Sequence, residues 1–367
     1  MKITLALFYF FYFALIGVYI IFMPKVLTDF HYSTFEVGLI YSSAPFMRFL
    51  LPFIFKYLIK LTKRVYLISL VLTLISTIIF LVTIENFTLY IMASLLFGAS
   101  MGISLPFVET ISLARLSKRE YGKVRLWGSL GFISIALWLG KVLSNSYEAL
   151  YYLLTMALFT LIFGFFAVRF DNQKEESNSS SDNDKNFSLM KYWAFWISLF
   201  LMQLSFGGFY NFFTIYELEH GVSLELASWM WTFGVICEIF MLYFQGYFLE
   251  KNLLNIIKVS IFVTIVRWLL LYLYADSVTI TFISQSLHAI SFALYHTATI
   301  TYIFSLYRQK KLAQQFVLGI GFGLGGSLGA LLSGEIYGEH LFLIEAIVAL
   351  FSFIMILIHN RRVELKC

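Results

Sequence analysis

The sequence has 367 residues, of which 60% are hydrophobic and 13% are charged, with a formal net charge of +5. Ordinary soluble domains contain about 45–50% apolar and about 25% charged residues, so this composition excludes that class. A membrane-spanning helix uses about 20 mainly apolar residues, and the chain holds enough of them for about eleven or twelve spans. We therefore expect an all-α polytopic membrane protein.

Twelve long apolar stretches follow one another along the chain. The first begins directly after Lys2 and continues past Gly17 without a small-residue cleavage site, so we interpret it as an uncleaved first span and not as a signal peptide. The expected spans cover about residues 3–24, 36–59, 65–84, 88–113, 124–144, 147–168, 191–217, 224–249, 253–274, 278–306, 313–336 and 341–359.

One polar segment divides the twelve spans into two sets of six. Residues 171–186 read DNQKEESNSSSDNDKN and contain no apolar side chain. Such a segment cannot bury enough surface to order itself. We expect an N-terminal six-helix bundle over residues 1–169, a flexible linker over 170–190, and a C-terminal six-helix bundle over 191–367.

The distribution of lysine and arginine predicts the orientation, because these residues are retained on the cytoplasmic side during insertion. With the N-terminus inside, 21 of the 26 basic residues lie in cytoplasmic segments, and only Lys25 and Lys141 lie in outer ones. We therefore expect a multi-pass protein of the cell (inner) membrane, with both termini and the linker in the cytoplasm.

The two halves resemble each other weakly, which is typical of transporters built from repeats. The segment 31–36 precedes the second span and 220–225 precedes the eighth, with His and Glu five residues apart in both. The tetrapeptide Gly-Ser-Leu-Gly occurs in the fifth span at 128–131 and in the eleventh at 326–329. Both matches have an offset of six spans, so we expect two pseudo-symmetric bundles.

Several segments carry a resemblance to a known family. Residues 120–133 read EYGKVRLWGSLGFI, 211–216 read NFFTIY, 234–239 read GVICEI, and 287–303 read LHAISFALYHTATITYI. In these segments the chain resembles the branch of the major facilitator superfamily that holds phenylpropionate permeases and the lactose permease. The resemblance implies two six-helix bundles around a central cavity, and secondary transport with proton symport by alternating access.

Ionisable residues in the apolar stretches are the candidate functional residues. A charge at the centre of a span costs about 2.5–3.5 kcal/mol on insertion scales, so such residues usually face a cavity and a partner. The candidates are Arg48, Glu109, Arg125, Glu238, Arg267, His288 and His296.

Glu109 closes the fourth predicted span and Arg125 opens the fifth. They form either a structural ion pair or a substrate site. The resemblance implies substrate binding, because the matching Glu and Arg of the lactose permease hold the sugar. An arginine also offers the planar pair of donors that a carboxylate substrate requires. Phe132 lies two turns beyond Arg125, where the lactose permease has a Trp that stacks on the sugar, which leaves room for another ring-bearing substrate.

In the second half, the resemblance implies that Glu238, Arg267 and His288 couple proton and substrate. The proton-carrying Glu of the lactose permease corresponds to Ser291 here, so we expect Glu238 to carry the proton. A static pair of Glu238 with Arg267 is the alternative. His288 and His296 lie eight residues apart on one predicted helix face and are expected to line the cavity.

Three further positions complete the predicted site. Gln203 and Asn211 lie in the seventh span, where they either bind substrate or bond a neighbouring helix. Arg48 is expected to act as a gating or structural charge. The glycine run between Gly319 and Gly329 predicts close helix packing.

These observations favour a secondary transporter, and not an enzyme, of a small organic solute. Three arginines, Arg48, Arg125 and Arg267, face two deeply placed acids, Glu109 and Glu238, so we expect a net positive cavity and an aromatic or other monocarboxylate as substrate. The alternatives are a sugar or nucleoside proton symporter, or a transport-inactive receptor or scaffold. The predicted partners are the solute, protons and the lipid bilayer, with no cofactor, metal or nucleic acid, and the predicted state is a monomer.

Overall fold

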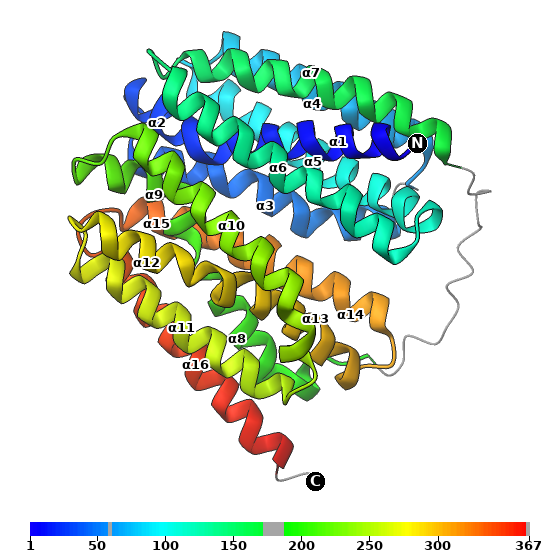
Figure 1. Ribbon diagram of the computed structural model, residues 1–367, viewed down its shortest axis with the longest axis vertical. Coiled ribbons are helices and arrows are strands. Elements are labelled where there is room, and N and C mark those ends of the chain that lie inside the picture. The colour runs from blue at the N-terminus through cyan, green and yellow to red at the C-terminus, as the bar shows by residue number, and fades with distance from the viewer. Residues whose placement is uncertain (58–60, 172–186, 365–367) are drawn as a thin grey trace. The chain divides into compact units, whose positions relative to one another are not determined.

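The structure, a computed structural model, describes residues 1–57, 61–171 and 187–364, and this part of the chain is helical without any strand (Figure 1). The helices of the first half are α1 (Lys2–Gly17), α2 (Met23–Asp29), α3 (Thr34–Tyr57), α4 (Lys63–Val82), α5 (Phe87–Arg115), α6 (Lys118–Val142) and α7 (Glu148–Ala167). Those of the second half are α8 (Trp193–Leu204), α9 (Gly207–Glu219), α10 (Leu224–Leu249), α11 (Leu253–Leu273), α12 (Val278–Ser286), α13 (Tyr295–Leu306), α14 (Lys310–Phe316), α15 (Gly326–Glu335) and α16 (Leu341–Glu364).

Three short π-helical segments join consecutive helices into single spans. They are η1 (Val18–Phe22) between α1 and α2, η5 (Ala289–Leu294) between α12 and α13, and η6 (Val317–Gly325) between α14 and α15. A π-helical hydrogen bond joins residues five apart instead of four, so a π segment accommodates an additional residue relative to the α-helical pattern. The spans containing η5 and η6 therefore change their side-chain register partway along their length.

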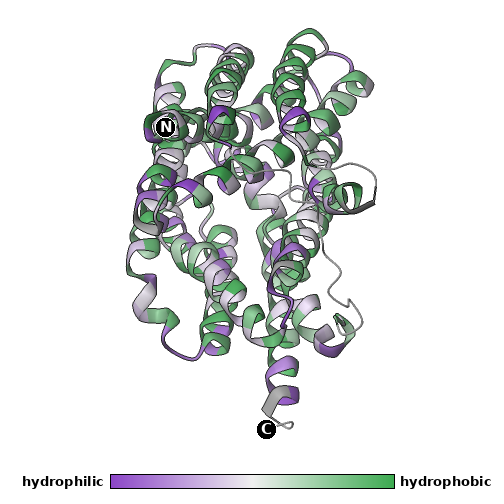
Figure 2. Ribbon diagram, turned by 90° about the vertical axis from the view of Figure 1, so that its right-hand side faces the viewer, coloured by the Kyte–Doolittle hydropathy of each residue, from purple (hydrophilic) through white to green (hydrophobic). Residues whose placement is uncertain are grey.

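Eleven of the described helical segments are long and apolar enough to cross a membrane. The twelfth expected span is α6, which is less apolar because it carries Lys123, Arg125 and Lys141. Hydrophobic residues cover long stretches of the helices (Figure 2). The all-α fold with twelve spanning helices is thus confirmed.

Helix α6 begins six residues before the predicted span because of its N-terminal cap. The side-chain oxygen of Ser117 accepts the backbone N–H of Glu120, and the Glu120 carboxylate accepts the backbone N–H of Ser117. This capping box satisfies two N–H groups that the first helical turn leaves free. Lys2 of α1 pairs with the same carboxylate at 2.6 Å. The cap therefore extends α6 beyond the apolar stretch on which the prediction was based.

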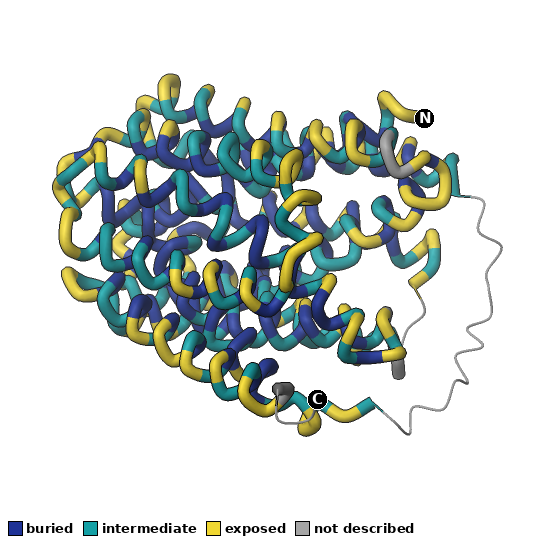
Figure 3. The backbone as a smooth tube through the Cα atoms, turned by 60° about the horizontal axis from the view of Figure 1, so that its bottom comes forward, coloured by how far each residue is buried: buried dark blue, intermediate teal, exposed yellow. Residues whose placement is uncertain are grey.

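The helices form two compact units. Unit 1 consists of Met1–Ser179 with Ser223–Thr232, and unit 2 consists of Ser180–Val222 with Phe233–Cys367. The first turns of α10 thus belong to unit 1 and its remainder to unit 2. Most of the predicted linker, residues 172–186, lies outside the described residues. Along the helices of each unit, buried residues alternate with exposed ones (Figure 3), as expected when one face packs within the unit.

A pair of equivalent turns shows the relation between the two halves. His31 after α2 has φ 63° and Gly221 after α9 has φ 80°. In each turn the next N–H donates to a helix carbonyl, that of Leu27 at 3.1 Å or that of Glu217 at 3.0 Å. This is the Schellman arrangement at a helix end. The structure therefore pairs His31 with Gly221, so the sequence alignment of His31 with His220 was wrong by one residue.

The repeated Gly-Ser-Leu-Gly tetrapeptide has the same packing role in both units. At Gly131 in α6, an added Cβ would overlap the carbonyl oxygen of Phe10, so α6 lies directly against the backbone of α1, as Figure 1 shows. At Gly329 in α15, an added Cβ would lie 2.7 Å from the carbonyl oxygen of Leu204. The predicted close packing at the glycine run is confirmed at this position.

Candidate functional site

Unit 1 contains the predicted pair of Arg125 and Glu109. The Nε atom of Arg125 lies 3.5 Å from Oε1 of Glu109, and the two side chains are 32% and 33% exposed. Both residues lie nearly two turns inside their helices, because α5 continues to Arg115 and α6 begins at Lys118. The sequence had placed them at the ends of the spans. An ion pair that is one-third exposed remains accessible to a charged solute.

Aromatic rings of α1 cover one face of the Arg125 guanidinium. Its Cζ atom lies 4.1 Å from the ring centroid of Phe13 and 5.5 Å from that of Tyr9. Gly128 makes room for this stack, since a Cβ there would lie 2.7 Å from Phe13 and 2.9 Å from Nη1 of Arg125. A cation over a ring face is attracted by the ring's quadrupole. Sequence analysis missed Tyr9 and Phe13, because α1 is aromatic throughout and nothing in its pattern distinguishes them.

Arg48 in α3 belongs to the same region of unit 1. Tyr12 in α1 interacts electrostatically with Arg48, Glu109 and Arg125, so the three charges lie near one tyrosine. The hydroxyl of Tyr12 donates to the carbonyl of Met101 at 2.9 Å. The Arg48 side chain is exposed. This region therefore combines two arginines, one glutamate and several aromatic rings.

Phe132 occupies a more enclosed position than the prediction supposed. Its side chain is buried, and an added Cβ at Gly17 would lie 3.3 Å from its ring. The ring meets that of Trp231 edge to face at 6.5 Å. Phe132 thus packs between α1 and the first turns of α10 and presents no open ring face.

Unit 2 contains a buried arginine bonded to its neighbours on the next span. Arg267 in α11 is fully buried, and its Nε donates to the carbonyl of Ser284 at 3.1 Å. Its Nη2 donates to Oε1 of Gln285 at 3.1 Å, and its Nη1 lies 2.9 Å from Nδ1 of His288. The Cζ atom lies 4.1 Å from the ring centroid of Phe209. Hydrogen bonds and a ring contact therefore hold the Arg267 guanidinium in place from several sides.

His288 lies between Arg267 and Glu238. A guanidinium has only donors, so Nδ1 of His288 accepts and the ring proton belongs on Nε2. This Nε2 lies 3.9 Å from Oε2 of Glu238, whose side chain is 24% exposed. The structure thus brings together the three residues predicted for coupling, in the order Glu238, His288, Arg267. A protonatable carboxyl beside a histidine N–H is suited to accepting and releasing a proton.

Two buried acids of unit 2 were missed. Glu345 in α16 is 2% exposed and Glu217 in α9 is 0% exposed. One Glu345 oxygen accepts the N–H of Gly208 and the hydroxyl of Ser333, the latter at 3.3 Å, and Glu345 interacts electrostatically with Arg267. The expectation of only two deep acids was therefore wrong. Both could have been found by the rule used for the others, an ionisable residue within an apolar stretch.

The two predicted polar residues of the seventh span contact other groups of unit 2. Asn211 donates from Nδ2 to the carbonyl of Gly207, in the same helix, at 2.6 Å. Gln203 is buried, and a Cβ at Gly325 in η6 would lie 3.1 Å from its own Cβ. Gln203 therefore packs against the glycine run, and Asn211 bonds its own helix instead of a neighbouring one.

The second predicted histidine lies on the span that continues through η5. His296 is half-buried, and its ring meets that of Phe322 edge to face at 5.3 Å. His288 stacks on Phe292 at 5.0 Å, and Phe292 in turn contacts Phe322 at 6.3 Å. The two histidines are thus linked through Phe292 and Phe322, although the π segment alters the helical spacing on which the prediction was based.

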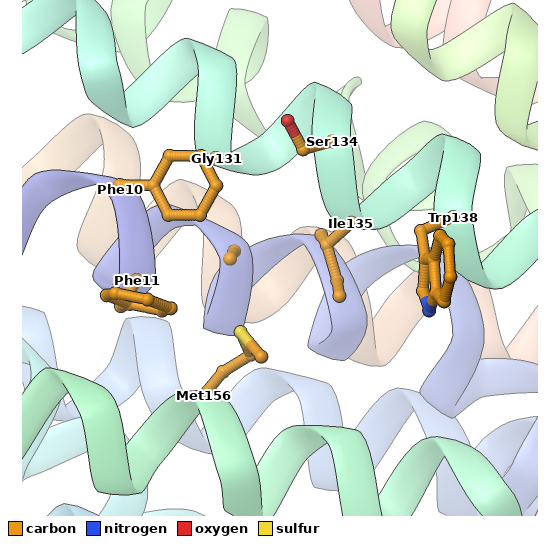
Figure 4. Close-up of a pocket in the computed structure, with 8 residues that line it drawn as sticks. Phe10, Phe11, Gly131, Ser134, Ile135, Trp138 and Met156 are labelled. Atoms are coloured by element: carbon orange, nitrogen blue, oxygen red, sulfur yellow. The ribbon is translucent and has the colours of Figure 1, made fainter. Parts of the chain in front are cut away.

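An apolar groove in unit 1 is separate from the predicted site. The groove has a volume of about 250 Å³ and contains none of the predicted site residues (Figure 4). Within the described residues, no group of three or more His, Cys, Asp or Glu side chains is arranged to hold a metal ion. The groove is lined by Phe10, Phe11, Ala14, Gly131, Ser134, Ile135, Trp138 and Met156.

Comparison with known proteins identifies several relatives. The model of the family described as "MFS_1 like family" matches residues 2–347. A "Probable 3-phenylpropionic acid transporter" of Escherichia coli (strain K12) is 24% identical over 63% of this chain, and the match spans 63% of that relative's length. The "Uncharacterized transporter YwbF" of Bacillus subtilis (strain 168) is 28% identical over 80% of this chain and 76% of its own. The "Sucrose permease" of Escherichia coli is 25% identical over 68% of this chain and 62% of its own.

Solved structures agree with this similarity at the level of the fold. A mutant of the nucleoside transporter NupG superposes with a TM-score of 0.83 at 18% sequence identity, covering 98% of this chain and 99% of that one. At this identity the likeness establishes the arrangement of helices and leaves the bound solute open.

Proposed function

Because the chain belongs to the MFS_1-like family of the major facilitator superfamily, we propose that it is a proton-coupled symporter of a small organic anion, with an aromatic or other monocarboxylate as its substrate. Transport proceeds by alternating access of the solute site to the two sides of the membrane. The relative named as a 3-phenylpropionic acid transporter supports this substrate class.

The observation that carries the substrate proposal is the environment of Arg125. Its side chain is one-third exposed, its guanidinium is stacked on Phe13, and a second arginine, Arg48, lies in the same region. Two arginines against Glu109 leave this region of unit 1 with a net positive charge. An arginine fork binds a carboxylate through two parallel hydrogen bonds. The surrounding rings of α1 would accept an aromatic or aliphatic body next to that carboxylate.

The order Glu238, His288, Arg267 supports proton coupling. A proton on Glu238 removes the negative charge that faces His288, so the positive charge of Arg267 is less compensated. That change favours the binding of an anion, and by reciprocity a bound anion favours protonation of Glu238. Glu238 is the partly exposed member of the three, and Arg267 and His288 position it.

A sugar or a nucleoside is the second candidate substrate. Half-buried His296 would bond hydroxyl groups, and buried Gln203 would do so if the span containing it moved. The name of the sucrose permease supports the sugar reading. A transport-inactive receptor is the remaining candidate function. Such a protein would bind the solute without exchanging it across the membrane.

The test is uptake by the purified protein in proteoliposomes. Radiolabelled 3-phenylpropionate, sucrose and uridine are supplied separately, each with an inward pH gradient, with an inward Na⁺ gradient, and with no gradient. We expect 3-phenylpropionate to accumulate with the pH gradient alone, beyond its accumulation in protein-free liposomes. Accumulation of sucrose or uridine in place of 3-phenylpropionate would reassign the substrate. Accumulation driven by Na⁺ alone would contradict coupling to protons. Binding without counterflow would identify a receptor.

A further inference from the structure

Glu217 is a buried acid that the proposed transport mechanism does not use. It lies in the last turns of α9, is 0% exposed, and neither of its carboxylate oxygens forms a hydrogen bond. Its polar neighbour is Thr281 of α12, whose buried hydroxyl interacts with the carboxyl without reaching full hydrogen-bond geometry. An isolated buried carboxylate is strongly disfavoured, so a carboxyl in this position is neutralised by a proton or a cation.

The fold itself does not require an acid at this position. The equivalent residue in unit 1 is Leu27, which is equally buried and accepts the same turn hydrogen bond through its backbone carbonyl. The bond lengths are 3.1 Å at Leu27 and 3.0 Å at Glu217. An apolar side chain therefore makes this turn equally well, and the carboxyl of Glu217 has a role other than forming it.

The acidic groups at this end of unit 2 interact with residues other than Glu217. Asp276 and Glu339 interact electrostatically with Tyr216, the neighbour of Glu217. Glu219 accepts the hydroxyl of Tyr337 at 2.6 Å.

The basic groups near α9 are held by other residues. Arg267 of α11 lies against Phe209, two turns from Glu217, and is bonded to Gln285 and His288. The Nδ1 of His220 donates to the carbonyl of Tyr216 at 2.7 Å, and the ring of His340 meets that of Tyr272.

The acids of the helices packed against α9 are Glu335 at the end of α15 and Glu345 in α16, and the latter is bonded to Gly208 and Ser333. Within the described residues no charged side chain interacts with Glu217, so a proton is the species that fits this enclosed site.

We propose that Glu217 is a second proton-binding residue, protonated whenever the end of α9 near Gly221 is closed. The inference rests on the proposed proton coupling and extends it. The carboxylate takes a proton from water when this end opens, forming a carboxylic acid with no other bond changed. Only the neutral acid can then be buried as observed, so closing this end requires the proton. Release of the proton to water occurs when the carboxyl is next exposed, and this ties the conformational cycle to the pH gradient.

The first experiment needs no transported solute. Infrared spectra of the purified, reconstituted protein are recorded at neutral pH in H₂O and D₂O for wild type, Glu217→Leu and Glu217→Gln. Glu217→Leu copies the residue at the equivalent position of unit 1, so it is expected to fold. Glu219→Gln, an exposed site in the same helix, is the matched control. We expect the carbonyl stretch of one protonated carboxyl to be lost in both Glu217 variants and kept in Glu219→Gln. The result should be the same whether the buffer cation is Na⁺ or N-methylglucamine, because a proton and not a metal cation neutralises the carboxyl.

The second experiment measures transport of 3-phenylpropionate. We expect Glu217→Leu and Glu217→Gln to lose pH-gradient-driven accumulation by tenfold or more while counterflow stays within twofold of wild type. A carboxylate band in place of the acid band, or undiminished accumulation by both variants, overturns the proposal. Wild-type protein that accumulates none of the probes contradicts the proposed function instead, and the infrared difference still decides whether Glu217 holds a proton.

Discussion

Arg48 in α3 and Glu238 in α10 occupy equivalent positions in the two units. Each is the seventeenth residue after the residue of positive φ in its turn, His31 in unit 1 and Gly221 in unit 2. The same place in the repeat thus carries a positive charge in one half and a negative charge in the other. This difference supports the proposed division, in which unit 1 attracts an anion and unit 2 exchanges a proton.

Replacing Glu238 with Gln should uncouple transport from the proton. The amide cannot be protonated, so we expect pH-gradient-driven accumulation of 3-phenylpropionate to fall at least tenfold while counterflow persists. Glu225→Gln is the control, since Glu225 is exposed in the first turn of the same helix. Both are measured in proteoliposomes. Undiminished accumulation by Glu238→Gln would remove Glu238 from the mechanism.

Arg125→Lys should raise KM for the substrate more than it lowers kcat. Lysine keeps the charge but loses the planar fork and the stack on Phe13. We expect KM to rise about tenfold, which corresponds to about 1.4 kcal/mol, with a smaller change in kcat. Initial uptake rates over a range of 3-phenylpropionate concentrations provide the measurement.

The charge exchange Glu109→Arg with Arg125→Glu separates binding from a structural role. A structural ion pair would survive the exchange, whereas an anion site would not. We expect less than a tenth of wild-type uptake with normal amounts of protein in the membrane. Near-normal transport by the exchanged pair would show that it only holds the two helices together.

Gly131→Ala should destabilise the protein through the contact of α6 with α1. The added methyl group would overlap the carbonyl oxygen of Phe10, and forced overpacking costs about 1–3 kcal/mol. Gly122→Ala in the same helix is the control, because an added Cβ there meets nothing within 4 Å. Thermal unfolding in detergent should show a lower midpoint for Gly131→Ala and an unchanged or higher one for Gly122→Ala.

The predicted orientation is testable by cysteine labelling of intact cells. In a background with Cys237→Ala and Cys367→Ser, a membrane-impermeant maleimide should not label Ser180→Cys, which lies in the predicted cytoplasmic linker. It should label Ser144→Cys, an exposed position in the predicted outer turn between α6 and α7. The reverse pattern would invert the topology.

The spans could be predicted because apolar length alone specifies a membrane helix. Helix ends were less accurate, since α6 begins at a capping box outside the apolar stretch. The pairing of Arg125 with Glu109 could be anticipated because buried charges need partners. The stack of Arg125 on Phe13 could not, because in an aromatic-rich helix only the packing around Gly128 selects one ring.

In unit 2 the sequence predicted which residues lie together but not their order. Glu238, His288 and Arg267 were expected together, and only the side-chain geometry shows that His288 lies between the other two. The one-residue error in aligning the repeats came from matching side chains. The fold instead repeats a backbone conformation, which His31 and Gly221 both adopt.

The π-helical segment η5 has a consequence for how such proteins diverge. A π segment arises where an α-helix accommodates one additional residue, so deleting one residue from Ala289–Leu294 would restore an α-helix. His288 precedes the segment, on the same side of it as Ser284 and Gln285, so it would stay beside Arg267. Insertions and deletions of single residues are therefore absorbed at η5 without breaking the helix. Relatives that lack the π segment should be one residue shorter here and should keep the residue that faces Arg267.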